Sequence, residues 1–410
     1  MEKSFQRPKF EEIVIPSHLL QDIMNEECVV FLGAGASTEA KEATGRPSYS
    51  RKLLIDELIE ECNYPSGLPK LLPEVAQYYC ESLDAGNKGR LVRLIRERID
   101  RITSNREVMH CHSIIASIPH FKVVVTTNWD PLMERAINAI PVVRDTDMAY
   151  WNDKSRQVIK MHGCITDPQS MIITMRDYQD YMNRRFDSPI SNKIRDLMST
   201  KTFLFLGYSL TDPNFETIHS DILKRLGAFA RTSFAILPNV TEHDITNWKE
   251  RGVIVIRGLA YPFLEKLRQI LIDRKIIFDL YNEMIILDDQ LQEIYQIHTH
   301  LDQDTDVGFA TAMYQDGLQH GLDGLIYALK TGITRDQVAD MLRRSKENLE
   351  YYESSTDKFA PMEVAYWNGR THCMEWFLSE DRKSLLKFFS ASRMKPINKV
   401  EFGRESKFHG

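Results

Sequence analysis

The chain has 410 residues, of which 43% are hydrophobic and 10% aromatic, enough apolar material for the cores of two or three domains. Its formal net charge of -6, from 52 basic and 58 acidic side chains, argues against a generally nucleic-acid-binding surface. Residues 382–410 are the exception, with eight Lys or Arg against two Glu. We expect a solvated end of the chain there, and a contact with an acidic partner or nucleic acid is the alternative.

Signals for export, membrane insertion and metal binding are lacking. No apolar run is long enough to span a bilayer, and residues 1–12 lack the hydrophobic core of a secretory signal, so we expect a cytoplasmic protein. The six cysteines are widely scattered and form no Cys-x-x-Cys pair. This spacing excludes a zinc ribbon, and we expect most of the thiols to be buried.

Short runs rich in Val, Ile and Phe predict seven buried strands. The runs are continuous rather than alternating, as expected where a sheet is covered on both faces. In chain order they are residues 28–32, 122–127, 158–161, 171–174, 202–206, 233–237 and 253–256. Helical periodicity between them, as in residues 50–62, predicts an α/β fold with a mostly parallel sheet and helices on both faces.

The pattern changes from about residue 266 onward. Long helical stretches follow one another there, without a convincing strand. We therefore predict two domains, an α/β domain of residues 1–270 and a mainly helical domain of residues 271–410.

Small or polar residues follow four of the predicted strands. Gly33 to Ser37 follow the first, Asn128 the second, His162 the third and Gly207 to Ser209 the fifth. Ligands of open parallel sheets bind outside the carboxyl ends of the strands, so these residues are predicted to share one site.

Each of these residues also has a purely structural interpretation. The glycines of the first turn let the backbone approach a phosphate, or they only allow a tight turn. Asp130 precedes a proline and fits a helix cap as well as it fits a ligand contact, and a lone histidine such as His162 is more often a packing residue than a base. An ordinary dinucleotide-binding dehydrogenase is disfavoured, because Thr38 stands where a third glycine is expected and a long helical region follows.

Taken together, these motifs resemble the Sir2 (sirtuin) family, specifically its SIR2-like bacterial antiphage-defence branch. The matching elements are GAGAS at residues 33–37, TTNWD at 126–130, HG at 162–163 and GYSL at 207–210. The resemblance covers about residues 20–265. It implies a Rossmann-like, NAD-binding core in which the nicotinamide–ribose bond is broken.

The sequence also departs from the sirtuin pattern. Sirtuin deacylases carry a zinc module with two Cys-x-x-Cys pairs after the histidine; this chain has none, so no zinc is expected and deacylation is disfavoured. The loop that corresponds to Gly-Ile-Pro-Asp-Phe-Arg reads GRPSYS at residues 45–50, with Ser50 where arginine is usual. We assign this loop no catalytic role and expect it to cover the nicotinamide pocket as a mobile lid.

The resemblance also implies roles for individual residues. Asn128 is expected to position the nicotinamide ribose or an attacking water, and His162 to contact the ribose hydroxyls and act as general base. Asp130 is expected either to favour the positive charge that develops on the ribose or to orient its loop. The residues expected to bind NAD+ are Gly33, Ala34, Gly35, Ser37, Thr126, Asp130, Gly207, Tyr208 and Ser209.

The function implied is that of an NAD+ glycohydrolase that releases nicotinamide and ADP-ribose and depletes NAD+ in antiphage defence. Such an activity needs control, so we expect a homo-oligomer, with a HerA-type ATPase as a candidate partner and the helical domain as the candidate site of assembly or regulation. The alternatives are an NAD-dependent protein deacylase, a non-enzymatic NAD or ADP-ribose sensor, and an interaction scaffold.

Overall fold

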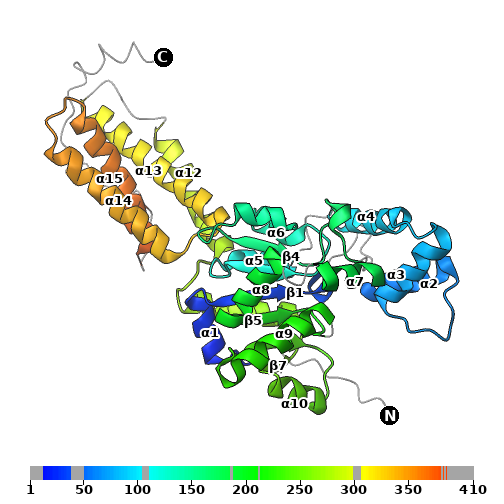
Figure 1. Cartoon of the computed structure of the whole chain (residues 1–410). Coiled ribbons are helices and arrows are strands. Elements are labelled where there is room, and N and C mark those ends of the chain that lie inside the picture. Colours follow the sequence, from blue (N-terminus) through cyan, green and yellow to red (C-terminus); the bar gives the residue numbers. More distant parts are fainter. Residues whose placement is uncertain are drawn as a thin grey trace. The chain divides into compact units, whose positions relative to one another are not determined.

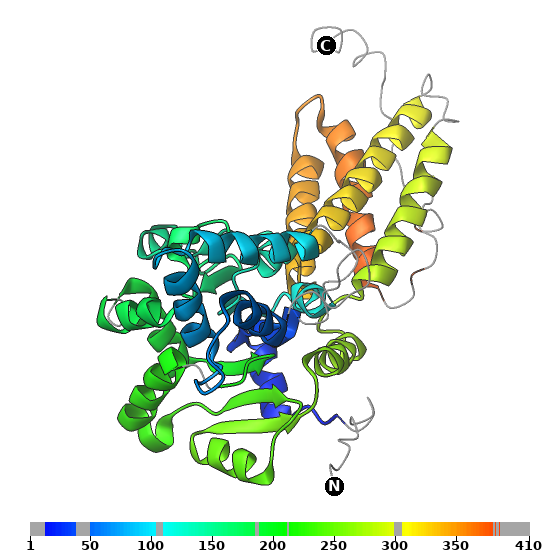
Figure 2. The ribbon, with the colours of Figure 1, turned by 90° about the vertical axis from the view of Figure 1, so that its right-hand side faces the viewer.

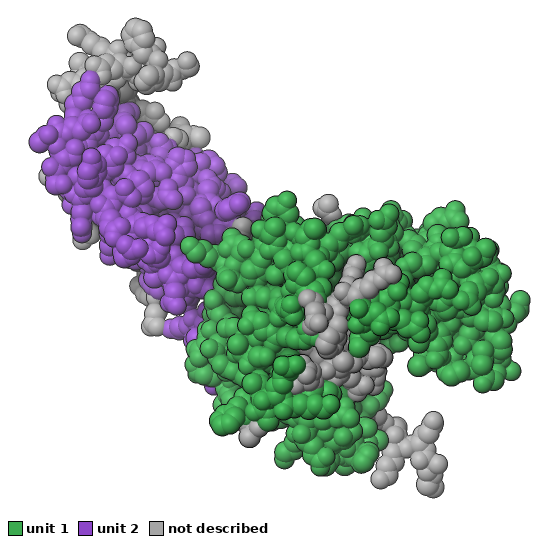
Figure 3. Space-filling view, viewed as in Figure 1, with its two compact units in different colours: residues 1–270 green, residues 271–410 purple. Residues whose placement is uncertain are grey.

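The computed structural model of the protein describes residues 13–37, 50–103, 110–184, 188–210, 213–298, 306–379, 382 and 385. The chain divides into two compact units, Met1–Ile270 and Leu271–Gly410, coloured green and purple in Figure 3. Within the described ranges, no helix combines the length and the apolar character needed to cross a membrane.

The first unit is built on a seven-stranded, all-parallel sheet with the strand order β3-β4-β2-β1-β5-β6-β7 (Figure 1). The strands are β1 (Cys28–Leu32), β2 (Val123–Thr126), β3 (Pro141–Val142), β4 (Gln157–Lys160), β5 (Thr202–Leu206), β6 (Ser233–Leu237) and β7 (Val253–Arg257). Leu32 pairs with Thr126 on one side and with Leu206 on the other. The carboxyl ends of β2, β1 and β5 are therefore level, and the turns that follow them leave from one edge.

Helices cover both faces of this sheet, which confirms the predicted Rossmann-like α/β fold. Side chains of α8 (Pro189–Thr200), α9 (Pro213–Leu226) and α10 (Glu242–Glu250) pack against one face. On the opposite face, His18 of α1 (Ser17–Met24) lies 4.9 Å from the ring of Phe234. Successive side chains of a strand point to opposite faces, so burial on both sides explains the continuous apolar runs.

Six of the seven predicted strands are present, and the prediction for residues 171–174 is wrong. This segment makes one backbone bond of the kind a strand would make, from Ile172 N to the His162 carbonyl at 3.0 Å. The N–H groups of Ile173 and Thr174 instead donate to the Asp177 carboxylate at 3.0 and 2.9 Å. The segment is apolar because it is buried before α7 (Met175–Arg184), whose first turn it caps.

Three helices between β1 and β2 form a helical insert, which we define as residues 51–103. They are α2 (Arg51–Cys62), α3 (Leu72–Leu83) and α4 (Gly89–Thr103), and α5 (His110–Ser117) follows them. Ser50, just before the insert, caps α2 by accepting a hydrogen bond from Leu53 N at 3.1 Å. The insert has its own apolar core, which includes Trp129 from the turn after β2. Figures 1 and 2 show its blue and cyan helices at one end of the strands.

The remaining helices complete the two units. In the first, α6 (Leu132–Ala136) precedes β3, and α11 (Ala260–Asp273) begins in this unit and ends three residues beyond its last residue, Ile270. The second consists, over its described residues, of α12 (Leu280–His298), α13 (Asp306–Thr331), α14 (Arg335–Ser354) and α15 (Ala360–Leu378) around a separate apolar core. This region is helical, as predicted. Most of residues 382–410, the predicted basic end, lie outside the described residues.

Candidate active site

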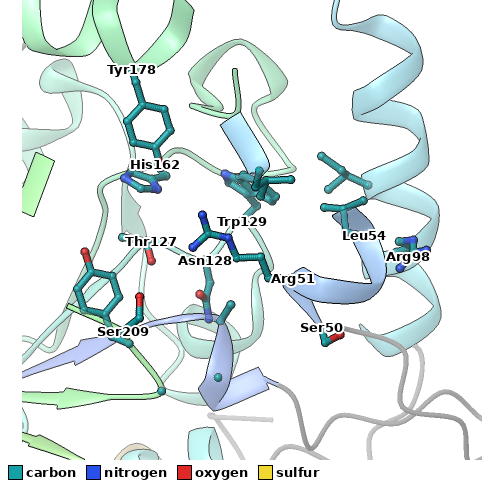
Figure 4. A pocket seen from close by; sticks show the side chains of 16 residues that line it. Ser50, Arg51, Leu54, Arg98, Thr127, Asn128, Trp129, His162, Tyr178 and Ser209 are labelled. Atoms are coloured by element: carbon teal, nitrogen blue, oxygen red, sulfur yellow. The ribbon is translucent and has the colours of Figure 1, made fainter. Parts of the chain in front are cut away.

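A cavity of about 270 Å³ lies in the first unit, where the turns after β1, β2, β4 and β5 meet the helical insert and α7 (Figure 4). Its volume is close to the roughly 300 Å³ at which small-molecule sites begin. The cavity is lined by Ala34, Gly35, Ser50, Arg51, Leu54, Leu72, Ile95, Arg98, Thr127, Asn128, Trp129, His162, Tyr178, Gly207, Tyr208 and Ser209. It therefore lies at the strand ends where the sequence places a ligand, between the diverging connections of β1 and β5.

The turns after β1 and β5 pack so closely against each other that only glycine fits at their contact. Gly35 N donates to the Gly207 carbonyl at 2.8 Å, and Gly207 has a φ of +62°. A Cβ on Gly207 would lie 2.1 Å from Ala36 N, and one on Gly33 would lie 2.5 Å from the Gly207 carbonyl oxygen. The glycines are thus explained by the close approach of two turns, and three of the N–H groups considered for a phosphate, those of Gly33, Gly35 and Ala36, bond within the protein.

Asn128 is held by hydrogen bonds to residues at the end of β2 and just after β1. Its backbone N–H donates to Thr126 Oγ1 at 3.0 Å, and Thr126 Oγ1 donates in turn to the Leu32 carbonyl at 3.1 Å. The Asn128 side-chain NH₂ donates to the Gly33 carbonyl and to Ser37 Oγ, both at 3.2 Å. Both amide protons are used in this way. Within the described residues no hydrogen bond engages the Asn128 amide oxygen, so this atom is left to accept one from a ligand.

Asp130 lies behind the cavity wall rather than in it. Its carboxylate accepts hydrogen bonds from Leu132 N at 3.1 Å and from Ser37 Oγ at 3.3 Å, and the residue is buried. The first bond satisfies the N–H of the first residue of α6, and the second connects Asp130 through Ser37 to Asn128. This placement fits the predicted loop-orienting role.

A buried lysine, Lys160, also holds the turn after β2, which carries Asn128 and Asp130. The Lys160 ammonium donates to the Asp130 carbonyl and to Glu134 Oε1, the latter at 2.8 Å. Burial alone lowers the pKa of Lys160, but the negative charges of Glu134 and Asp130 outweigh it and leave this pKa above its ordinary value. Nearby on α5, burial lowers the pKa of His112 and favours its neutral form.

His162 follows β4, the strand next to β2, and lines the cavity together with Asn128. The next residue, Gly163, has a φ of +80°, and a Cβ there would lie 2.3 Å from the Ser170 carbonyl oxygen. Only glycine allows the chain to turn away so closely after the histidine. The ring of Tyr178, on α7, packs edge-on against the His162 ring, with 5.4 Å between centroids and an interplanar angle of 73° (Figure 4).

Charge in the cavity is positive. Arg51 and Arg98 line it, and among the described residues no Asp or Glu does. Arg98 forms an ion pair with Glu57 of α2. Within the described part of the chain, no hydrogen bond or ion pair engages the Arg51 guanidinium, which points into the cavity in Figure 4. The cavity therefore suits a ligand with an anionic group.

The other wall is apolar. Leu54, Leu72 and Ile95 of the helical insert lie beside Trp129, opposite the polar turns of the sheet edge. A ligand with both a flat apolar ring and an anionic group matches such a divided lining. Among the described residues, no group of three or more His, Cys, Asp or Glu could hold a metal ion.

The structure brings most of the predicted site residues to this cavity. Those that line it are Ala34, Gly35, Asn128, His162, Gly207, Tyr208 and Ser209. Gly33, Ser37, Thr126 and Asp130 are one layer behind and reach it only through the hydrogen bonds described above. Of the predicted lid, residues 45–49 lie outside the described residues, and Ser50 lines the cavity.

Sequence reasoning missed the lining residues that come from helices, and two that come from the turn after β2. Thr127 and Trp129 flank Asn128 and could have been included with their motif. Arg51, the other insert residues and Tyr178 carried no such local signal, because they come from segments between strands and meet the site only through the packing of the insert and α7.

Comparison with known proteins identifies related sequences. Residues 122–256 match the family described as SIR2-like domain. The chain is 32% identical over 208 residues to NAD(+) hydrolase ThsA of Bacillus cereus (strain MSX-D12), covering 49% of this chain and 41% of the relative. It is 30% identical over 240 residues to NAD(+) hydrolase ThsA of Enterococcus faecium, covering 57% of this chain and 48% of the relative. These matches thus span less than half the length of the curated relatives.

Proposed function

We propose that this chain, which carries a SIR2-like domain, is an NAD+ glycohydrolase that releases nicotinamide and ADP-ribose. One observation carries the proposal: Asn128 and His162, from different strands, line a single cavity together with the glycine turns after β1 and β5. Relatives named NAD(+) hydrolase support the choice of substrate.

In the proposed reaction, water replaces nicotinamide on the ribose. The bond between the ribose C1′ and the nicotinamide nitrogen breaks, and its electron pair stays with nicotinamide. The water oxygen forms the new bond to C1′ and gives up a proton, for which His162 is the base. The Asn128 amide oxygen accepts a hydrogen bond from the water or from a ribose hydroxyl, which fixes the geometry of attack.

Regulation belongs to the same proposal. Unrestrained hydrolysis would drain cellular NAD+, so we place the activity in the cytoplasm under the control of an infection signal, in antiphage defence. We assign assembly into a homo-oligomer, or docking of a partner such as a HerA-type ATPase, to the helical unit. The support for this part is the resemblance of the motifs to SIR2-like defence proteins.

The test is incubation of the purified full chain with NAD+, alone and with candidate activators, and chromatography of the products. We expect nicotinamide and ADP-ribose in equal amounts, and their loss in Asn128→Ala and His162→Ala. Asn239→Ala and His243→Ala, which change exposed residues of the same types, are the matched controls. An acyl-lysine peptide in a parallel reaction distinguishes deacylation, which would convert the peptide. Unchanged NAD+ cleavage in both site variants would refute the site assignment.

A further inference from the structure

Lys160 is an unusual residue for the end of an interior strand of a sheet. It is the last residue of β4, two positions before His162, and its side chain is 0% exposed. Removing an ammonium group from water costs several kcal/mol unless its new partners compensate, and an apolar residue there would avoid that cost. The partners of Lys160 therefore indicate what it does.

One partner of Lys160 lies in the turn that carries Asn128, and the other lies on α6, the helix that follows this turn. The Lys160 ammonium donates to the main-chain oxygen of Asp130, two residues after Asn128, and to Glu134 Oε1 on α6 at 2.8 Å. It is thus bonded to the turn itself, and not only to an acidic side chain. We define this turn as residues 127–131, between the end of β2 and the start of α6.

Hydrogen bonds to the main chain and to the side chain of Asp130 connect the ammonium, through Ser37, to the Asn128 amide. The Asp130 carboxylate accepts from Ser37 Oγ at 3.3 Å, and Ser37 Oγ accepts from the Asn128 NH₂ at 3.2 Å. Lys160 fixes the main chain of the turn, and Ser37 connects the turn to the segment after β1. The cavity-facing amide is therefore held from two sides.

We propose that Lys160 is a positioning residue of this site: its ammonium fixes the 127–131 turn so that the Asn128 amide oxygen stands where the ribose or the attacking water binds. The inference rests on the proposed NAD+ hydrolysis for its catalytic consequence, and on the hydrogen bonds alone for the placement of the turn. The competing interpretation is that Lys160 only neutralises Glu134.

The two interpretations differ for a variant that lacks both charges. Loss of Lys160 alone leaves Glu134 buried without its cation and can prevent folding. In Lys160→Met/Glu134→Leu, both charges are replaced by apolar side chains of similar size, and such replacements are often neutral or stabilising. The matched variant Glu134→Gln keeps the ammonium and an oxygen acceptor for it.

We expect the double variant to fold with a melting temperature near that of the wild type. Its kcat should fall roughly ten- to a hundredfold, because a small displacement of a catalytic group has an effect of this size. KM should stay within about threefold, since neither substituted residue lines the cavity. Glu134→Gln should retain most of kcat. Wild-type kcat in the folded double variant would overturn the proposal in favour of simple charge compensation.

Hydrogen exchange provides a readout that does not depend on activity. In the double variant we expect faster amide exchange in a peptide that covers residues 127–132, with unchanged exchange in β1 and β5. Unchanged exchange in that peptide would overturn the positioning role. If the wild type fails to cleave NAD+ both alone and with the candidate activators, the proposed function fails, and this exchange measurement still decides whether Lys160 fixes the turn.

Discussion

At the scale of single residues, the Asn128 side chain shows how the cavity is prepared for a ligand. Its donors form hydrogen bonds within the protein, and its amide oxygen faces the place where a ligand would bind. Asn128 uses its backbone N–H and both amide protons internally. Ser37 accepts from Asn128 and donates to Asp130, so it transmits position from one strand end to the next. This arrangement orients the amide oxygen before any ligand arrives, which reduces the reorganisation needed on binding.

Substitution of Gly207 by alanine should disrupt the two interlocked turns. The new Cβ would lie 2.1 Å from Ala36 N, on a backbone with a φ of +62°. Together the overlap and the strained conformation should lower the free energy of unfolding by roughly 2 kcal/mol or more. Urea denaturation measures this change. Gly67→Ala, where a Cβ meets nothing within 4 Å, is the control, and equal effects of the two substitutions would contradict the steric explanation.

Arg51 should contribute binding rather than chemistry. Its guanidinium faces the cavity, and a hydrogen bond from it to an anionic group is worth roughly 1.5–3 kcal/mol. In Arg51→Ala we expect KM for NAD+ and the Kd for ADP-ribose to rise about tenfold or more, with kcat little changed. Steady-state kinetics and calorimetry give these values. Arg93→Ala, an exposed arginine of the same insert, should change neither, and unaltered binding by Arg51→Ala would exclude the contact.

At the scale of elements, α7 connects the helical insert to His162. Lys88, just before α4, donates to Asp177 Oδ1 at 2.7 Å and to the Met171 carbonyl at 3.2 Å. Asp177 also caps the first turn of α7. The residue after Asp177 is Tyr178, and its ring packs against the His162 ring. One carboxylate thus anchors both the cap of the helix and its contact with the insert.

Asp177→Asn should weaken this anchor in a pH-dependent manner. Burial raises the pKa of Asp177, but the hydrogen bond from Lys88 and the N–H groups of Thr174 and Ile173 outweigh it and lower this pKa below its ordinary value. A lowered pKa contributes stability that is complete above the unfolded value of about 3.9 and is lost as pH falls through the folded value. We expect the variant to be roughly 1–3 kcal/mol less stable at pH 7.

Denaturation by urea at pH 7 and across the acid range tests this expectation. The difference in the free energy of unfolding between the wild type and Asp177→Asn should begin to shrink below about pH 4, where Asp177 of the unfolded chain takes up a proton, and should be lost once the pH falls below the lowered folded pKa. Asp180→Asn, an exposed residue of the same helix, is the control and should behave as the wild type. A difference that stays constant down to the lowest pH would show that charge is not the cause.

The elements whose bounds the sequence predicted best are strands that are buried at every position. Residues 28–32, 202–206 and 233–237 form strands with the predicted bounds, because burial on both faces selects the same apolar residues at every position. Residues 171–174 show the same composition for another reason, since they are buried without a partner strand. β3 was missed because two residues, Pro141 and Val142, are too few to make a run.

The predicted site follows the same logic. Asn128, His162 and the glycine turns could be placed because parallel strands bring their carboxyl ends to one edge. Asn128 lines the cavity, whereas Asp130, two residues later, lies behind its wall. Which residue does which depends on the directions of the side chains within a single turn. Strand order and local composition do not determine those directions.

At the scale of the whole molecule, the two units have separate apolar cores. Val30 lies in the central strand of the first unit, and Leu322 lies in the core of the second; both are fully buried. NAD+ or ADP-ribose, as proposed, would bind to the first unit only. A ligand that binds only the native state of one unit stabilises that unit by mass action.

Calorimetry of the full chain should therefore show two unfolding transitions. Val30→Ala should lower the temperature of one and Leu322→Ala that of the other, each by removing buried methyl groups. ADP-ribose at about 100 times its Kd should stabilise the first unit by about 2.7 kcal/mol, which raises the transition that Val30→Ala lowers by roughly 5–10 °C. The second transition should not move. A single transition that both substitutions and the ligand shift together would mean that the two cores unfold as one cooperative body, and control by the helical unit would then act through global stability.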